Sequence, residues 1–308
     1  MGKKYLKQII GYRGILSSVL AMIFIVSCSV KTPKDQTEYA KSFDGERIAY
    51  HTGGRGEVTL LFVHGWCCDN SYWREQVPAF EKKYKVITMD LAGHGDSGHN
   101  RKIYSVDSYG QDVKAVMEAS DAKNVIVIGH SMGGEIVATA AHSINSGQAR
   151  MEPNPVIGII GVDTLHNVEE DINDEIVQGM TDGMKKDFKG WMKNFVEEIT
   201  GKEIKPELKK RITAEMVSAP PDIAINTFEQ YVDKLKDKKI ARLFMEIKVP
   251  VRCVNADLWP MDAEANRKYM ADFGVKIMKG AGHFPMLERP EEFNKLLKES
   301  IEEIISRK

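Results

Sequence analysis

The feature that most constrains this chain is a serine set between glycines at the end of an apolar run. Residues 125–128 are β-branched and predict a buried strand, and Gly129-His130-Ser131-Met132-Gly133 interrupts the run before a helical pattern begins. In such a G-x-S-x-G turn the serine has a strained backbone and its hydroxyl projects above the sheet. The flanking glycines have no Cβ, so strand and helix can approach closely. We therefore predict that Ser131 is a nucleophile, although so short a pattern also arises by chance.

The N-terminal residues have the composition of a targeting segment. Four basic residues and no acidic one precede a short apolar run at residues 15–26, which is followed by Ser27 and Cys28. The run is too short for a comfortable membrane span. The pattern resembles a bacterial lipoprotein signal peptide, in which the cysteine is lipidated and becomes the first residue of the mature protein.

This resemblance implies a signal peptide at residues 1–27, a lipid on Cys28 and a polar tether over residues 28–41. We then expect the protein to be anchored to a bacterial membrane in the cell envelope, on the periplasmic side or at the cell surface. An uncleaved membrane anchor and an ordinary secretory signal are the alternatives.

Composition excludes some classes of partner. The chain has 308 residues, 43% of them hydrophobic and 28% charged, as in an ordinary globular protein. The formal net charge is −1, which gives no reason to expect a nucleic-acid partner.

The remaining cysteines are Cys67, Cys68 and Cys253, and they do not have metal-ligand spacing. We expect no metal and no cofactor. Cys253 falls in a predicted strand and should be a buried small hydrophobe. For the adjacent pair we prefer two free thiols to a strained vicinal disulfide.

Apolar runs recur along the chain and alternate with helical patterns. The segment 42–50 predicts a hairpin around Asp44-Gly45. Further strands are predicted at 59–63, 85–90, 156–162, 250–256 and 275–278, and helices at 105–119 and 291–305. This alternation predicts an α/β fold, with a mostly parallel sheet and helices on both faces. Ligands of such sheets bind beyond the carboxyl ends of the strands.

The segment 164–248 interrupts this alternation. It is strongly charged, has helical runs and contains no convincing strand. We predict a helical cap there, inserted into a core formed by residues 42–163 and 249–308. Most of its methionines and aromatic residues should form the cap's own core, with a few facing a substrate.

Polar motifs follow several of the predicted strands. These are His64-Gly65, the turn 90–97, the serine motif with Gly134, Asp257 and Gly282-His283. In this order they resemble the α/β-hydrolase fold superfamily, in its capped esterase and lactonase-like branch. The resemblance extends from about residue 42 to the end of the chain. It is specific for the fold and much less specific for a substrate.

The resemblance implies a catalytic triad of Ser131, Asp257 and His283. A serine hydroxyl needs an adjacent base, and an imidazole can take and return a proton near neutral pH. His283 lies in a glycine-rich loop before the last helix, where the family places its histidine. Asp257 directly follows a predicted strand, the usual position for the acid that orients the imidazole. Asp163 follows the preceding strand, which some branches use instead; we prefer Asp257.

The resemblance also implies an oxyanion hole built from the backbone N–H groups of Trp66 and Met132. The Trp66 indole should form a pocket wall, pack under the cap, or do both. Among the other polar residues of these motifs, His64 is expected to be a structural hydrogen bonder, and Asp90 and Asp96 to hold their glycine-rich turn. His94 should at most line the pocket, and His130, beside the nucleophile, should point elsewhere.

These residues predict a serine hydrolase acting on a carboxylic ester, with a lactone or thioester left open. An aspartate in place of Ser131 would have indicated dehalogenase or epoxide hydrolase chemistry. The segment 64–68 also lacks the His-Gly-Gly-Pro-Gly sequence of proline iminopeptidases. The same residues serve lipases, perhydrolases and carbon–carbon bond hydrolases. The alternative from another class is a receptor-like protein that binds a small molecule on the same fold without turning it over.

Overall fold

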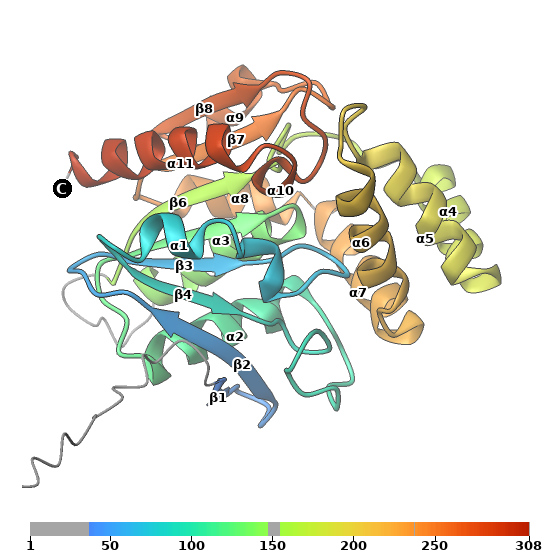
Figure 1. The fold of residues 1–308 in the computed structure, drawn as a ribbon, viewed down its shortest axis with the longest axis horizontal. Helices are drawn as coiled ribbons and strands as arrows, with labels where there is room; N and C mark the ends of the chain where they lie inside the picture. The colour runs from blue at the N-terminus through green and yellow to red at the C-terminus, as the bar shows by residue number, and fades with distance from the viewer. Residues whose placement is uncertain (1–36, 147–154, 237, 308) are drawn as a thin grey trace, which may run out of the picture. The chain divides into compact units, whose positions relative to one another are not determined.

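The apolar runs assemble into one eight-stranded sheet in the order β1-β2-β4-β3-β5-β6-β7-β8 (Figure 1). The computed structural model describes residues 37–146, 155–236 and 238–307. The strands are β1 (Glu38–Lys41), β2 (Arg47–Gly53), β3 (Thr59–Val63), β4 (Lys85–Met89), β5 (Val125–His130), β6 (Val156–Val162), β7 (Val251–Ala256) and β8 (Phe273–Met278). The pairs β1–β2 and β2–β4 are antiparallel and all other neighbours are parallel. The predicted α/β fold class is confirmed.

Alternate residues of the central strands face two different hydrophobic layers, because side chains alternate across a strand. In β3, Leu61 and Val63 pack with α2 (Val106–Ala119) and α3 (Met132–Ser146). Leu60 and Phe62 pack on the opposite face, with buried residues of α1 (Val77–Phe80) and α11 (Pro290–Ile305). Every residue of β3 and β5 is buried, which explains their uninterrupted apolar sequences.

The chain between β6 and β7 is helical throughout its described elements. The helices are α4 (Asp174–Lys186), α5 (Phe188–Ile199), α6 (Pro206–Val217), α7 (Pro221–Lys236) and α8 (Lys239–Glu246). Figure 1 shows α4 to α7 gathered beyond the carboxyl ends of the parallel strands, as predicted for a cap. Met184, Met192 and Met216 are buried within it.

The predicted cap is too long at its end. The α8 helix packs against α3. Its apolar residues Ile240, Ala241 and Phe244 join the hydrophobic layer on the face of the sheet that α2 and α3 cover. It therefore belongs to the core. The short helices η2 (Asn70–Trp73), α9 (Ala263–Tyr269) and α10 (Pro285–Glu288) complete the described elements and were not expected from the sequence.

Only part of the predicted N-terminal organisation falls within the described residues. Cys28 and the signal peptide lie outside the described residues. The predicted tether is shorter than expected, because Glu38–Lys41 pairs with β2 as an edge strand and buries Ala40. In the described part of the chain, no helix has the length and apolar character needed to cross a bilayer.

The three cysteines of the described residues are free and buried, as preferred from the sequence. Burial raises the pKa of each thiol, so Cys67, Cys68 and Cys253 stay protonated and pack as small hydrophobes.

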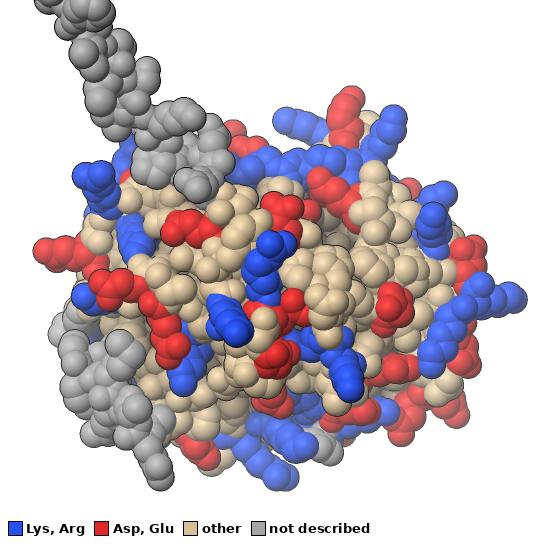
Figure 2. Space-filling model, turned by 90° about the horizontal axis from the view of Figure 1, so that it is seen from below, with Lys and Arg blue, Asp and Glu red and all other residues tan. Residues whose placement is uncertain are grey.

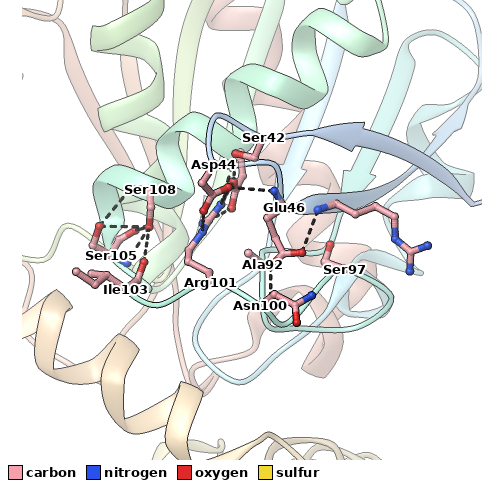
Figure 3. Close-up of polar contacts among 12 residues, drawn as sticks. Ser42, Asp44, Glu46, Ala92, Ser97, Asn100, Arg101, Ile103, Ser105 and Ser108 are labelled. Atoms are coloured by element: carbon pink, nitrogen blue, oxygen red, sulfur yellow. Dashed lines mark hydrogen bonds and ion pairs between the residues drawn. The ribbon is translucent and has the colours of Figure 1, made fainter.

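A buried ionic network fastens the β1–β2 turn to α2. The Arg101 guanidinium donates to both carboxylate oxygens of Asp112, at 2.8 and 2.6 Å, and to Asp44 at 2.8 Å. Ser42 donates to Asp112 as well, at 2.5 Å. Figure 3 shows Arg101 reaching toward Ser42 and Asp44. Elsewhere, on the face seen in Figure 2, acidic and basic side chains are interspersed, as expected for ordinary surface charges.

We predict that Asp112→Ala lowers the free energy of unfolding by about 3 kcal/mol, because it leaves the Arg101 charge partly unpaired in a buried site. Asp112 is fully buried. Urea denaturation at pH 7 measures the effect. Asp96→Ala removes an exposed carboxylate from a nearby turn and should change stability little. Equal losses in the two variants would show that the network does not carry this stabilisation.

Candidate active site

Ser131 has the strained backbone that its motif predicts. Its φ is 53°, in the left-handed region that favours glycine, and its N–H donates to the Val162 carbonyl of β6 at 2.9 Å. The α3 helix begins at the next residue, Met132. Strand, serine and helix thus follow one another without a spacer, and the side chain is held at the carboxyl edge of the sheet.

Close backbone approach explains the glycines around Ser131. A Cβ at Gly129 would lie 2.1 Å from the Gly133 carbonyl oxygen, so no larger residue fits there. A Cβ at Gly65 would lie 2.8 Å from Nδ1 of His130 and 3.1 Å from Cβ of Ser131. The loop after β3 therefore lies directly against the serine. The Trp66 and Met132 segments meet at Ser131, while their function as an oxyanion hole stays a prediction.

The catalytic histidine candidate is paired with a buried carboxylate. Nδ1 of His283 lies 2.6 Å from Oδ2 of Asp163, at the end of β6. The other carboxylate oxygen, Oδ1, accepts the Ala256 N–H at 2.9 Å and lies 3.5 Å from Nε2 of His166. Asp163 is 1% exposed, so these donors replace the water that a carboxylate requires.

The prediction that Asp257 orients His283 is wrong. Asp257 is exposed and accepts the Gly280 N–H at 2.7 Å. Local contacts account for the difference. Asp163 stands in a left-handed turn after β6 and bonds His283, whereas the Asp257 carboxylate, after β7, is engaged by the Gly280 N–H instead.

The turn that carries Asp163 is built by its neighbours. Asp163 has a φ of 46° and Leu165 a φ of 53°, so the chain bends sharply as it leaves β6. The Asn255 side chain clamps this bend, donating to the Thr164 carbonyl at 2.8 Å and accepting the Thr164 N–H at 3.3 Å. These contacts aim the Asp163 carboxylate at the histidine loop.

Electrostatics keep Asp163 ionised. Burial raises its pKa, but the nearby imidazoles of His166 and His283 lower the pKa more, and the result lies well below the usual range. An ionised carboxylate accepts a hydrogen bond from the N–H at Nδ1 of His283. This leaves Nε2 without a proton, so Nε2 is the nitrogen that can act as a base.

Two contacts fix the backbone of His283. Its N–H donates to the Ile199 carbonyl at 2.8 Å, and its carbonyl oxygen lies 2.7 Å from Nε2 of His130. Burial lowers the pKa of His130 to about 3, so this imidazole is neutral and donates the bond from Nε2. His130 therefore positions the loop that carries His283, and the expectation that its side chain points elsewhere is wrong.

Glu288 holds the same loop from the other side. Its carboxylate accepts the N–H groups of Gly282 at 2.9 Å, Gly201 at 3.2 Å and Phe284 at 3.3 Å. Because Gly201 follows α5, these bonds join the histidine loop to the cap. Nothing in the sequence pattern indicates that Glu288 joins the loop to the cap, since Glu288 and Gly201 are 87 positions apart.

His64, His94 and Asp90 are buried and make structural contacts, as predicted for His64 and Asp90. Burial lowers the pKa of His64 to about 4 and that of His94 to about 3. His64 accepts the Leu91 N–H at 3.0 Å, and its other ring nitrogen lies 2.8 Å from the Gly65 carbonyl. Asp90 accepts the N–H of Asp96 at 2.9 Å, and Asn70 bonds to its other oxygen at 2.7 Å.

The Trp66 side chain anchors the cap. Its indole N–H donates to the Ala224 carbonyl of α7 at 2.9 Å. Its ring packs against Trp191, Phe195 and Phe228, with centroids 5.8 to 6.1 Å away. Packing under the cap is thus confirmed. Phe195, not Trp66, is the member of this cluster that reaches the cavity beside Ser131.

Ser131, Asp163 and His283 share one cavity of about 250 Å³. Apolar side chains of the turn after β6 and of α7 and α8 form much of its wall, among them Val168, Leu235 and Ile240. Trp259 stands edge-on between His283 and His166, at centroid distances of 5.0 and 5.6 Å. In the described residues, no group of three or more potential ligands is placed to hold a metal ion.

Glu135 and His166 are among the polar residues of the cavity that were not predicted from the sequence. Glu135 stands one helical turn beyond Ser131, a spacing that places two side chains on one helix face and could have drawn attention to it. His166 follows Asp163 in an irregular segment, where no periodicity predicts which way a side chain points.

Known proteins similar to this chain were found by sequence and by structure. Residues 58–201 match a protein family described as alpha/beta hydrolase fold. A karrikin insensitive 2 receptor of Petunia hybrida is 22% identical over 77% of this chain and 89% of its own length. A non-heme chloroperoxidase of Burkholderia pyrrocinia is 37% identical, over 36% of this chain and 40% of its own.

Among solved structures, an esterase from Exiguobacterium antarcticum superposes with a TM-score of 0.74 at 20% identity, covering 87% of this chain and all of that one. The sheet order, the strained serine and the inserted helices therefore identify the architecture: the chain has the α/β-hydrolase fold.

Proposed function

We propose that the protein is a serine hydrolase that cleaves a carboxylic ester through an acyl-enzyme on Ser131. The observation that carries this proposal is the 2.6 Å contact between His283 and the buried Asp163, in the cavity that also contains the strained serine. A nucleophile, a base and an acid that orients the base are the three parts that serine catalysis requires.

In the proposed reaction, Ser131 Oγ attacks the acyl carbon while His283 Nε2 takes the hydroxyl proton. The backbone N–H groups of Met132 and Trp66 stabilise the oxyanion, and such a donor typically contributes about 3 kcal/mol to lowering the barrier. When the tetrahedral intermediate collapses, the C–O bond breaks and the alcohol leaves with the proton held by His283. Water then attacks the acyl-enzyme by the same steps in reverse and releases the acid.

Asp163 contributes charge and orientation. As His283 takes the proton its imidazole becomes positive, and the adjacent carboxylate stabilises that charge in a site with little water. The cavity of about 250 Å³ beside the triad favours a small acyl group at the reacting carbon, while Trp259 also lines a larger hollow of about 1070 Å³. A small lactone or thioester fits the same chemistry.

We predict that the soluble domain, lacking residues 1–28, hydrolyses p-nitrophenyl esters with an optimum at short acyl chains. Ser131→Ala should reduce kcat/KM by about 10⁵-fold or more, because it removes the nucleophile. The measurement is release of p-nitrophenol across acetate to palmitate. A folded domain with no turnover and no labelling of Ser131 by a fluorophosphonate would favour the receptor-like alternative, for which the Petunia relative is the precedent.

The two candidate acids give a sharper test. Asp163→Asn should lower kcat/KM by about 10³-fold or more, because the amide no longer fixes the tautomer of His283 or stabilises its charge. Asp257→Asn is the matched control, since its carboxylate is exposed and bonds only the Gly280 N–H among the contacts seen. It should retain activity within a few-fold. The reverse ranking in the same ester assay would assign the acid to Asp257.

We also propose that the protein is a lipoprotein anchored through Cys28, on the strength of its N-terminal sequence. Expression of the full chain with a radiolabelled fatty acid in a bacterial host should label the wild-type protein and leave Cys28→Ala unlabelled and released from membranes. Cys67→Ala is the matched control and should stay labelled. Equal membrane retention of Cys28→Ala and wild type would favour an uncleaved anchor.

A further inference from the structure

A second carboxyl group lies in the cavity beside the catalytic residues. Glu135 stands in the first turn of α3 and lines the same cavity as Ser131 and His283. It is 6% exposed, so its carboxyl group is almost entirely removed from bulk water. The proposed reaction makes no use of it.

The hydrogen bonding of Glu135 is incomplete. Oε1 accepts a bond from the Tyr231 hydroxyl of α7 at 3.2 Å. Oε2 is buried and has no partner among the described residues. An unpaired buried oxygen destabilises a fold, so a carboxyl kept only for structure would be expected to have both oxygens bonded.

No cation neutralises Glu135 by direct contact among the described ion pairs. The nearest ammonium that acts on it, that of Lys234, bonds Asp107 at 2.5 Å and Thr139 at 3.3 Å instead. Burial raises the pKa of Glu135 to about 7, against the lowering effects of its own backbone N–H, Tyr231, Lys234 and Thr164. Near neutral pH the carboxyl group therefore exists in both protonation states.

The surroundings of Glu135 restrict what it can recognise. Leu165, Leu235 and Ile240 line the cavity with it and have no polar side-chain atoms. A hydroxyl group can donate to a carboxylate and can also accept from a protonated carboxyl, so it suits both states of Glu135. An ammonium group would suit only the ionised state.

We propose that Glu135, supported by Tyr231, recognises a hydroxyl group on the acyl part of the substrate, so that the preferred esters are those of small hydroxy acids. This inference rests on the proposed ester hydrolysis and specifies its substrate class. Glu135 acts as a specificity residue: it binds the substrate beside the reacting bond and takes no part in the proton transfers.

The experiment compares kcat/KM for matched p-nitrophenyl esters of 2-hydroxybutyrate, 3-hydroxybutyrate and 6-hydroxyhexanoate with those of their methyl ethers. The wild-type protein should prefer at least one hydroxylated ester by about tenfold, the size expected when a buried acceptor gains or loses its donor. Glu135→Met, similar in volume and without a carboxyl, should abolish that preference. An absence of preference in wild type, or the same preference in both proteins, would overturn the proposal.

Matched variants distinguish a loss of hydroxyl recognition from a general disruption of the fold. Glu170→Gln alters an exposed carboxylate at the rim of the same cavity and should keep the preference for the hydroxylated ester. If Glu135→Met folds poorly, Glu135→Met combined with Tyr231→Phe removes both polar groups and leaves no unpaired hydroxyl. That double variant should also lack the preference.

Unsubstituted p-nitrophenyl butyrate distinguishes the two proposals. Hydrolysis of this ester by wild type, with no preference for hydroxylated esters, would overturn only the recognition by Glu135. If wild type hydrolyses none of the esters, the proposed function fails, and binding is then measured on Ser131→Ala. There the hydroxylated ester should raise Tm more than its methyl ether, and the added Glu135→Met substitution should remove the difference.

Discussion

The site depends on one buried contact, that between the Asp163 carboxylate and the His283 imidazole. A carboxylate with 1% exposure is stable only if protein donors replace its water, and the donors here are His283 and the Ala256 N–H. The His166 imidazole lies 3.5 Å away. The positions of these groups require a left-handed residue after β6 and the Asn255 clamp on the following turn. The conformation of the chain after β6 therefore serves to place and solvate this one carboxylate.

Local sequence patterns predict much of this architecture. The β-branched runs became strands because such side chains pack well on a pleated surface, and the glycines around Ser131 mark a turn that no other residue type fits. The choice between Asp163 and Asp257 could not be made in the same way. Both follow buried strands, and what distinguishes them is tertiary contact: Asn255 holds the turn after Asp163, and Gly280 bonds Asp257. Such contacts join residues far apart in the chain, which short patterns do not encode.

The cap illustrates the same limit. Its helices were predictable from charge and periodicity, whereas its attachments were not, because each joins residues far apart in the chain. On one side the Trp66 indole bonds the Ala224 carbonyl of α7, and on the other Glu288 and Ile199 bond the histidine loop to the end of α5. The cap is thus fastened to both loops that flank Ser131. A displacement of the cap would also displace the loops that carry Trp66 and His283, so the cap is part of the candidate site.

The carboxyl groups at this end of the sheet differ in how completely they are bonded. The buried Asp90 and Asp163 and the half-buried Glu288 each have protein donors on both oxygens, and each holds a turn or the His283 loop in place. Glu135 accepts from Tyr231 on Oε1, and its Oε2 has no partner among the described residues. A complete set of donors fixes a structure and leaves nothing for a ligand, while an incomplete set in a cavity leaves an acceptor that a substrate can occupy. The difference in bonding therefore separates the carboxyl groups that build the site from the one that is available to select what enters it.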